Sequence, residues 1–293
     1  MNVLTRLKMN MMSIIGWTIK ISGALFGILS TLLLFVSWDE LKATDQLVKI
    51  SILLGILLVS FLSSCVLVVF VLRRNRIWKK GKNSVSASYG DLMELAFNKR
   101  YKRQKIIVVP FNDTFDTSVE IADERTNKPL VSPYTLHGVW IERFCKQEKI
   151  NENDLNKRIQ ESLQKHDFDG ERIIRDRGNN IRYKRGTVAI INGENNTIFY
   201  LLAISSFDDR NNAQCTRKEL RDAIDSLMLF YDRNGQGIPM FLPLMGTGSS
   251  RIDITHQQSL KIIKSSVLTS EKINGSVNIV VYNGDKNKVS IFE

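Results

Sequence analysis

Two uncharged, mostly apolar stretches near the N-terminus constrain this chain more than any other feature. The second, Ile50 to Leu72, has 23 residues without a charge. As a helix it would be roughly 35 Å long, which is enough to cross the hydrocarbon core of a bilayer. The first runs from Ile21 to Trp38 and is extended by Ile14 to Ile19. It is longer than the apolar core of a signal peptide, and a second stretch follows at once, so we expect two transmembrane helices.

The charges beside these stretches predict how the anchor crosses the membrane. Asp39 to Lys49, between the stretches, has three acidic and two basic residues, whereas Arg73 to Lys82 has six basic residues. Under the positive-inside rule both termini then lie in the cytoplasm. The sequence therefore predicts a multi-pass membrane anchor in residues 1–82, with helices at about 14–38 and 50–72.

A small-residue motif lies in the first stretch. Gly23 and Gly27 form a G-x-x-x-G pattern, and Ser30 continues the same helix face. This spacing lets helices approach closely in lipid. It fits packing between the two spans of one chain as well as packing between copies of the chain.

The net charge of +11 is concentrated at the membrane end of the chain. Residues 1–82 have 11 Lys and Arg against 3 Asp and Glu, whereas residues 83–293 have 30 against 27. A nucleic-acid partner is therefore not expected. The cysteines, Cys65, Cys145 and Cys215, are far apart and have no C-x-x-C spacing, which is typical of a reducing compartment and of a chain without a zinc site.

The remainder of the chain predicts a linker and one soluble domain. Residues 83–104 are expected to be a basic linker, because Gly81 to Gly90 is rich in serine and Lys99 to Lys105 is a basic run. From residue 105 to 293, apolar runs typical of strands alternate with helical patterns. The expected strands are Ile106 to Val109, Thr187 to Ile191, Thr197 to Ser205, Ile238 to Met245, Val277 to Val281 and Val289 to Phe292.

Helices are expected between these strands. They run from Pro133 to Phe144, through Leu155, Ile159 and Leu163, behind a capping box at Thr216, and from Thr255 to Val267. A hairpin turn is expected at Asn192-Gly193. Interleaved helices and strands predict an α/β fold, a three-layer α/β/α domain with a mixed sheet.

The strand at Ile238 to Met245 leads into a glycine-containing loop, Gly246-Thr247-Gly248. Such a loop lets backbone N–H groups approach an anion, and a helix that follows would add unpaired donors. The loop is therefore a candidate phosphate site. An ordinary turn between a strand and a helix explains the same residues, because the Walker and dinucleotide patterns are absent.

Four segments together make the soluble part resemble a macro domain, the ADP-ribose-binding fold. The segments are Val109 to Thr117, Ser132 to Gly138, Gly186 to Phe207 and Pro243 to Arg251. With the two spans, the whole chain resembles the membrane-anchored macro-domain effectors of Thoeris anti-phage defence systems. The resemblance implies the bacterial inner (cell) membrane as location. It also implies an ADP-ribose-derived signal, made by a partner NAD-consuming TIR-domain enzyme, that triggers oligomerisation and membrane disruption.

The resemblance also implies a ligand site, with no metal and no catalytic group expected. Its candidate residues are Asn112, Asp113, Phe115, Asp116, Thr117, Ser132, His137, Gly138, Phe207, Gly246, Thr247, Gly248, Ser249 and Arg251. Several of them have a plainer explanation: Asp113 and Asp116 as turn residues, His137 as packing at a helix start, Phe115 and Phe207 as core, and Arg251 as a surface side chain.

The loop from Ser132 departs from the family pattern, because His137-Gly138 stands where ADP-ribosyl hydrolases have a glycine-rich run. This difference favours a ligand-binding effector over an enzyme. A membrane-tethered ADP-ribosyl hydrolase or ADP-ribose phosphatase is the alternative, and a structural tether that binds only protein is a third interpretation.

Overall fold

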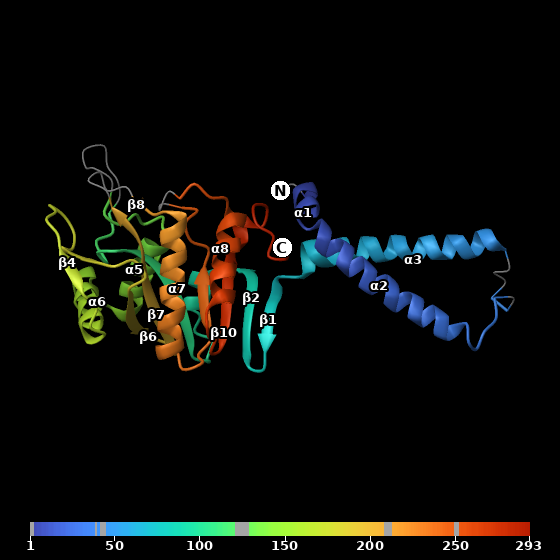
Figure 1. Ribbon diagram of the computed structural model, residues 1–293, viewed down its shortest axis with the longest axis horizontal. Helices are drawn as coiled ribbons and strands as arrows, with labels where there is room; N and C mark the ends of the chain where they lie inside the picture. Colours follow the sequence, from blue (N-terminus) through green and yellow to red (C-terminus); the bar gives the residue numbers. More distant parts are fainter. Residues whose placement is uncertain (1–2, 39, 42–44, 121–128, 208–212, 249–251) are drawn as a thin grey trace. The chain divides into compact units, whose positions relative to one another are not determined.

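The computed structural model describes residues 3–38, 40–41, 45–120, 129–207, 213–248 and 252–293. The chain divides into two compact units. The first is Met1–Asn75 together with Val289–Glu293, and the second is Arg76–Lys288. Figure 1 labels their helices and strands, and each unit is described by itself.

The second unit is built on an eight-stranded mixed sheet with the order β1-β2-β10-β9-β3-β7-β6, and β8 pairs with β7 (Figure 1). The strands β2, β10, β9, β3 and β7 are parallel to one another, and β6 and β8 are antiparallel to β7. The strands are β1 (Arg74–Lys80), β2 (Asn83–Gly90), β3 (Lys105–Asn112), β6 (Val188–Gly193), β7 (Thr197–Phe207), β8 (Ala213–Gln214), β9 (Met240–Pro243) and β10 (Ser276–Tyr282). A separate hairpin pairs β4 (Gly170–Arg172) with β5 (Ile181–Tyr183).

Helices cover both faces of this sheet. On one face, α4 (Leu92–Ala96), α5 (Leu136–Glu148) and α6 (Glu152–Lys165) bury Trp140, Phe144 and Leu155 against one side of β3 and β7. On the other face lie α7 (Arg217–Asn234), against β7, and α8 (His256–Thr269), against β10. The predicted three-layer α/β/α fold with a mixed sheet is therefore confirmed.

The helix starts follow from local capping. Thr216 and Thr255 each form a complete capping box, as the sequence predicts for Thr216. Helix α5 begins at Leu136, three residues later than predicted, because the side chain of Thr135 accepts a hydrogen bond from the Gly138 N–H. The cap, rather than Pro133, determines where this helix begins.

The expected linker is wrong at its start, because residues 83–90 form strand β2 of the sheet. Val85 and Ala87 are fully buried, and β2 pairs with β10 over its whole length, from Ser84↔Ser276 to Gly90↔Tyr282. Serine at the alternate positions hides this strand in the sequence, although Ser86 is also buried.

Two further details differ from the sequence prediction. Asn192 and Gly193 belong to β6, and the hairpin turns instead at Asn195 and Asn196, whose φ angles of 55° and 56° suit a tight turn. Val289 to Phe292 is not a strand, although Val289 and Ile291 are buried.

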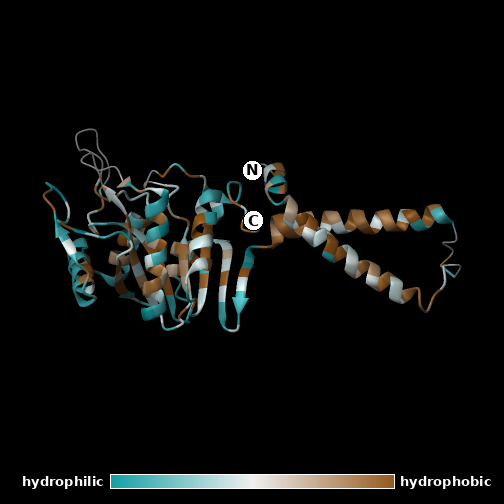
Figure 2. Cartoon of the chain, in the orientation of Figure 1, coloured by the Kyte–Doolittle hydropathy of each residue, from teal (hydrophilic) through white to brown (hydrophobic). Residues whose placement is uncertain are grey.

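The first unit contains two long apolar helices. They are α2 (Met11–Leu32), preceded by α1 (Val3–Met9), and α3 (Gln46–Val66), which continues as a π-helical turn, η1 (Leu67–Val71). Met11–Leu32 and Gln46–Val71 are long and apolar enough to cross a membrane by length and composition (Figure 2).

The packing of α2 on α3 separates small residues into two groups. Ser22 on α2 and Ser60 and Ser64 on α3 are buried. A Cβ at Gly23 or Gly27 would meet no atom of the described chain within 4 Å, and both glycines are exposed. Packing within one chain therefore leaves the G-x-x-x-G face uncovered.

Candidate functional site

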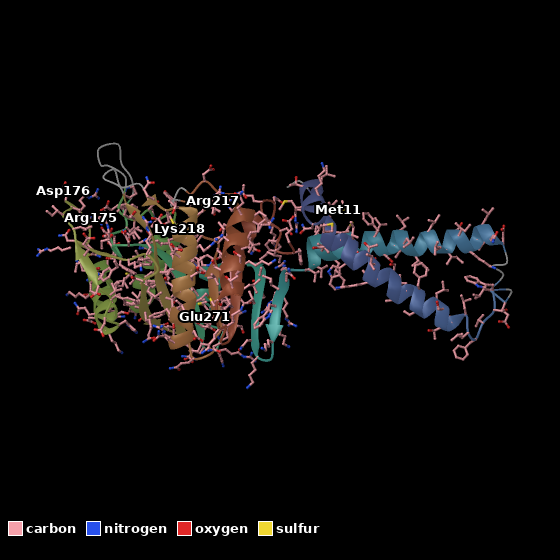
Figure 3. The ribbon with its side chains drawn as sticks, in the orientation of Figure 1. Met11, Arg175, Asp176, Arg217, Lys218 and Glu271 are labelled. Carbon is pink, nitrogen blue, oxygen red and sulfur yellow. The ribbon has the colours of Figure 1, made fainter. Side chains whose placement is uncertain are left out.

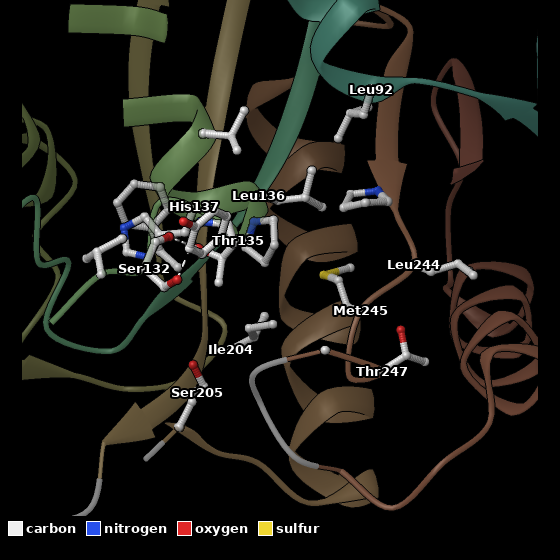
Figure 4. Close-up of a pocket in the computed structure, with 18 of the residues that line it drawn as sticks. Leu92, Ser132, Thr135, Leu136, His137, Ile204, Ser205, Leu244, Met245 and Thr247 are labelled. Carbon is white, nitrogen blue, oxygen red and sulfur yellow. Dashed lines mark hydrogen bonds between the residues drawn. The ribbon is translucent and has the colours of Figure 1, made fainter. Parts of the chain in front are cut away.

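A cavity of about 880 Å³ lies at the carboxyl ends of the parallel strands (Figure 4). It is bounded by the last residues of β2, β3, β7, β9 and β10, or by the residues just after them. This edge of an open α/β sheet is where ligands bind, because loops from several strands converge there. The volume lies in the upper range of small-molecule sites.

The loop after β9 forms one wall of the cavity through Gly246, Thr247 and Gly248. Gly246 has φ of +90°, and a Cβ there would lie 2.8 Å from Cδ1 of Ile252, so this position requires glycine. Within the described residues a Cβ at Gly248 would have no neighbour within 4 Å. Gly246 therefore shapes the loop, whereas Gly248 leaves backbone open to the cavity.

The helix after this loop starts where the sequence predicts, with its N-cap at Thr255, which is seven residues beyond Gly248. Helix α8 begins at His256, and the Thr255 side chain already accepts a hydrogen bond from the Gln258 N–H. Its first turn is thus capped within the chain. Anion binding at this loop would depend on the loop's own backbone N–H groups.

The opposite wall is the loop before α5, drawn around Ser132, Thr135 and His137 in Figure 4. The backbone oxygen of Ser132 accepts a hydrogen bond of 2.8 Å from the Thr135 hydroxyl. A Cβ at Gly138 would lie 2.2 Å from that same oxygen. Gly138 therefore lets the loop lie against the helix, and it is Ser132 and His137 that line the cavity.

His137 is the one described histidine in the cavity wall. Its ring lies against Phe111, with ring centroids 3.6 Å apart, and its Nε2 atom has no hydrogen-bond partner among the described residues. Burial lowers the pKa of His137 to about 3, although a backbone hydrogen bond with Asp116 acts in the opposite direction. The imidazole is therefore neutral at cellular pH and could make one hydrogen bond to a ligand.

Asp116 lies beneath the loop after β3, outside the cavity wall formed by the described residues. Its Oδ2 accepts hydrogen bonds from Asn112 Nδ2 (2.6 Å), Thr114 Oγ1 (2.8 Å) and Arg175 Nη1 (3.1 Å). Its Oδ1 accepts a bond of 2.7 Å from the Asn179 N–H. With its carboxylate fully used, Asp116 positions the loop. Asn112 lines the cavity, while its own amide bonds to Thr114 and Asp116.

The segment that holds Asp116 joins β4 to β5, and Arg175 is labelled there in Figure 3. Gly178 has φ of +81°, and a Cβ there would lie 2.4 Å from Asp116 Oδ1. This segment therefore approaches the loop closely only because residue 178 is glycine.

Asp113 is also buried, with 4% of its surface exposed. Its Oδ2 lies 3.5 Å from Arg182 Nε, and its Oδ1 has no hydrogen-bond partner in the described part of the chain. Burial raises the pKa of Asp113 to about 6, and the charge of Arg182 opposes that shift. Asp113 is therefore a destabilised buried carboxyl rather than a group presented to the cavity.

The two candidate phenylalanines have different places. Phe115 is fully buried, has φ of 52°, and contacts Tyr183 edge-on with ring centroids 5.7 Å apart. Phe207 is half-buried in the cavity wall at the end of β7. Only Phe207 is placed to stack on a ligand. Thr117 donates a hydrogen bond to the backbone oxygen of Glu152 and is buried.

The structure therefore brings together half of the candidate residues. Those that line the cavity are Asn112, Ser132, His137, Phe207, Gly246, Thr247 and Gly248. Those that the described residues place outside its wall are Asp113, Phe115, Asp116, Thr117 and Gly138. Ser249 and Arg251 lie outside the described residues.

Several wall residues are missed by sequence reasoning because they follow the unrecognised strand β2. Asp91, Leu92 and Met93 lie there, and Asp91 Oδ1 accepts hydrogen bonds from the N–H groups of Met93 (2.8 Å) and Glu94 (3.0 Å). The available signal was the alternation of Val85, Ala87 and Tyr89 before Gly90-Asp91.

Charged side chains are few in the wall as far as it is described. They are Arg143 on α5, Asp91, and Asp285, whose Oδ1 lies 2.8 Å from Lys288 Nζ. No group of three or more His, Cys, Asp or Glu residues that could hold a metal occurs among the described residues. Backbone, hydroxyl and apolar groups thus dominate a site that suits an uncharged base and ribose more than a bare anion.

A mixed sheet covered by helices on both faces, with a cavity of about 880 Å³ at the carboxyl ends of its parallel strands, is the arrangement of an α/β domain of the macro type. A family model described as the macro domain of Thoeris protein ThsA matches residues 85–282. The chain belongs to this family, and it is a ThsA-type macro-domain protein of Thoeris anti-phage defence.

Several individual proteins are similar to this chain. The Thoeris protein ThsA of Bacillus amyloliquefaciens (strain Y2) is 25% identical over 265 residues, which cover 88% of this chain and 82% of that protein. Among solved structures, a variant of the Oceanobacillus iheyensis macrodomain matches with a TM-score of 0.45 and 8% identity, covering 74% of this chain and 93% of that chain. The same macrodomain with ADP has a TM-score of 0.38 and 10% identity, covering 73% and 90%.

Proposed function

We propose that the macro domain binds an ADP-ribose-type nucleotide as a signal, and that the occupied domain acts on the membrane through the two apolar helices. The signal is the product of a partner NAD-consuming TIR-domain enzyme, with which a Thoeris system pairs a protein of this family. Occupancy drives several copies together, and their helices disrupt the cell membrane.

The observation that carries the proposal is the cavity of about 880 Å³ between the loops at Ser132–His137 and Gly246–Gly248. Backbone at Gly248 is open to an approaching diphosphate, and Phe207 offers a face for stacking. The Oceanobacillus iheyensis macrodomain has been solved with ADP and, as a variant, with ADPR. We infer the same ligand class for this chain.

We propose binding without turnover. Of the acidic candidates, Asp116 is fully hydrogen-bonded under the loop and Asp113 is paired with Arg182. In the described wall, Asp91 caps α4 and Asp285 is paired with Lys288. Asp285 also lies 3.6 Å from His256 Nε2. Asp91 and Asp285 are thus both engaged by neighbouring groups of the chain, and we infer that the site supports recognition better than hydrolysis.

The membrane step requires more than one copy. Two helices cannot enclose a water-filled path, because one side of the pair stays open to lipid. The face with Gly23 and Gly27 is left uncovered by the packing of α2 on α3 as described, and it offers a surface for close contact with a second copy.

Calorimetric titration of the full chain in detergent with ADP-ribose tests the proposal, with AMP as the comparison ligand. We expect saturable binding of ADP-ribose at one site and weaker binding of AMP, which lacks the second phosphate and ribose. Absence of ADP-ribose binding would refute the proposal. Steady release of product from ADP-ribose or an ADP-ribosylated peptide would support the hydrolase or phosphatase alternative instead.

A further inference from the structure

We propose that the C-terminal segment Val289–Glu293 couples the cavity to the ends of both apolar helices. The inference rests on the proposed function, because it describes how occupancy reaches the helices. It concerns a segment that is neither part of the cavity wall nor part of a span.

The C-terminal segment belongs to the first unit although the sequence places it after the sheet. Ser290 is fully buried, and its hydroxyl donates a hydrogen bond of 2.6 Å to Asn10 Oδ1. Asn75 Nδ2 donates a bond of 2.7 Å to the backbone oxygen of Ile291. The segment is thus held at one point before α2 and at another just after the second apolar helix, and Figure 1 draws the C-terminal end near α1.

Asn10 connects this contact to the ends of the helices. It lies between α1 and α2, and its Nδ2 donates a bond of 2.7 Å to the Arg6 backbone oxygen. The Arg6 guanidinium donates to the backbone oxygen of Val69 and lies 5.6 Å from the ring centroid of Phe70. One polar network, Arg6-Asn10-Ser290 with Val69, therefore joins the C-terminal segment to α1, to the start of α2 and to η1.

The π-helical turn η1 lies at the end of the second apolar helix, where we expect ligand binding to alter the backbone. In η1, the N–H of Leu72 bonds to the Leu67 oxygen rather than to the oxygen four residues before it. Such turns occur mostly as single-turn irregularities inside α-helices, and they are frequent at functional sites. Val69, to which Arg6 donates, lies inside this turn.

Chain connectivity carries the signal from the other side. Val280 and Tyr282 on β10 and Asp285 after it line the cavity. Only residues 286–288 separate Asp285 from the C-terminal segment. The four steps from Asp285 to Val289 span at most about 14 Å, so we expect movement of Asp285 on ligand binding to reach Val289 through this short connection.

The chain thus passes between the units twice, at Asn75/Arg76 and at Lys288/Val289. With the first connection alone, the two units could rotate about one point of the chain. A second passage that ends in a buried hydrogen-bonded network restricts how the two helix ends move relative to each other. A ligand can use this restraint only if it binds one arrangement more tightly than another.

Hydrogen exchange on the full chain in detergent, with and without ADP-ribose, tests the coupling. In the wild type we expect ADP-ribose to change exchange of the peptides that contain Val3–Met9 and Leu67–Val71. Ser290→Ala and Asn75→Ala each remove one anchor of the C-terminal segment. In both we expect at least tenfold faster exchange in Val3–Met9, no further change with ADP-ribose, and an ADP-ribose affinity within twofold of the wild type.

Ser265→Ala is the matched control, because that exposed hydroxyl on α8 bonds only to its local Ile262 oxygen in the described contacts. Retained affinity in the variants shows that the macro domain is folded. Normal affinity with wild-type exchange and a wild-type response in both variants would overturn the coupling. If the wild type itself binds no ADP-ribose, the proposed function fails, and the coupling fails with it. If the wild type binds ADP-ribose without any change in the two helix-end peptides, only the coupling fails.

Discussion

Arg175 donates a hydrogen bond of 3.1 Å to Asp116 across 59 residues of sequence, and this contact holds the loop that carries Asn112 into the cavity. The Asp116 side chain is 1% exposed and that of Arg175 is 16% exposed. A buried carboxylate that loses its cation keeps its desolvation cost, so the pair constrains the loop strongly.

We therefore expect Arg175→Met to destabilise the protein by about 3 kcal/mol, the lower end for breaking a buried pair, because Asp116 keeps its other three hydrogen bonds. Thermal unfolding of the full chain in detergent measures this. Arg172→Met on the exposed strand β4 is the control and should change little. Equal melting temperatures for the two variants would contradict a structural role for the pair.

The two glycines of the loop after β9 should behave differently. Gly248→Val introduces a side chain into the cavity where the described structure has open space, so we expect at least tenfold weaker ADP-ribose binding with unchanged thermal stability. Gly246→Val forces a branched residue into φ of +90° and against Ile252, so it should also lower stability, by about 1–3 kcal/mol. Wild-type affinity in Gly248→Val would remove this loop from the site.

Asp113→Asn should stabilise the protein at neutral pH but not in acid. The folded pKa of about 6 lies above the ordinary value of 3.8, so the folded state holds this proton longer than the unfolded state. Stability from this carboxyl is therefore greatest below pH 3.8, falls as pH rises through the window from 3.8 to 6, and is lost above it.

The asparagine variant lacks this loss. Its advantage over the wild type should grow from near zero at pH 4 to about 1–3 kcal/mol at pH 7.5. Melting temperatures of the wild type and the variant across this pH range measure the difference in stability. His137 contributes with the opposite pH dependence, but it is present in both proteins, so its contribution cancels in the difference. Exposed Asp176→Asn is the control. A constant difference at all pH values would show that Asp113 is not destabilised by burial.

Gly27→Ile should block assembly without affecting the cavity. The branched side chain covers the close-approach face of α2, whereas packing of α2 on α3 in the described structure does not use this position. Light scattering in detergent should show that ADP-ribose increases particle mass for the wild type and for the exposed control Ala24→Ile, but not for Gly27→Ile. The same increase in all three would exclude this face from assembly.

The sequence was sufficient wherever local patterning decides structure. The apolar stretch from Ile50 to Leu72 and the capping box at Thr216 depend on consecutive residues, and a helix forms at each: Gln46–Val71 includes most of the stretch, and α7 follows Thr216. The first apolar helix, α2, ends at Leu32 rather than near residue 38. The order of strands and helices likewise follows from hydrophobic period, and it predicts the three-layer fold.

Long-range pairing decided the rest. Strand β2 is recognisable only once β10 lies beside it, because serines occupy alternate positions of an otherwise buried strand. The roles of Asp113 and Asp116 depend on Arg182 and Arg175, which come from the β4–β5 hairpin about 60–70 residues later. In sequence these carboxylates resemble ligand groups after a strand. In the structure both carboxylates are buried outside the cavity wall, because a buried charge requires a partner and each has an arginine beside it. No local sequence pattern specifies which distant residue will supply that partner.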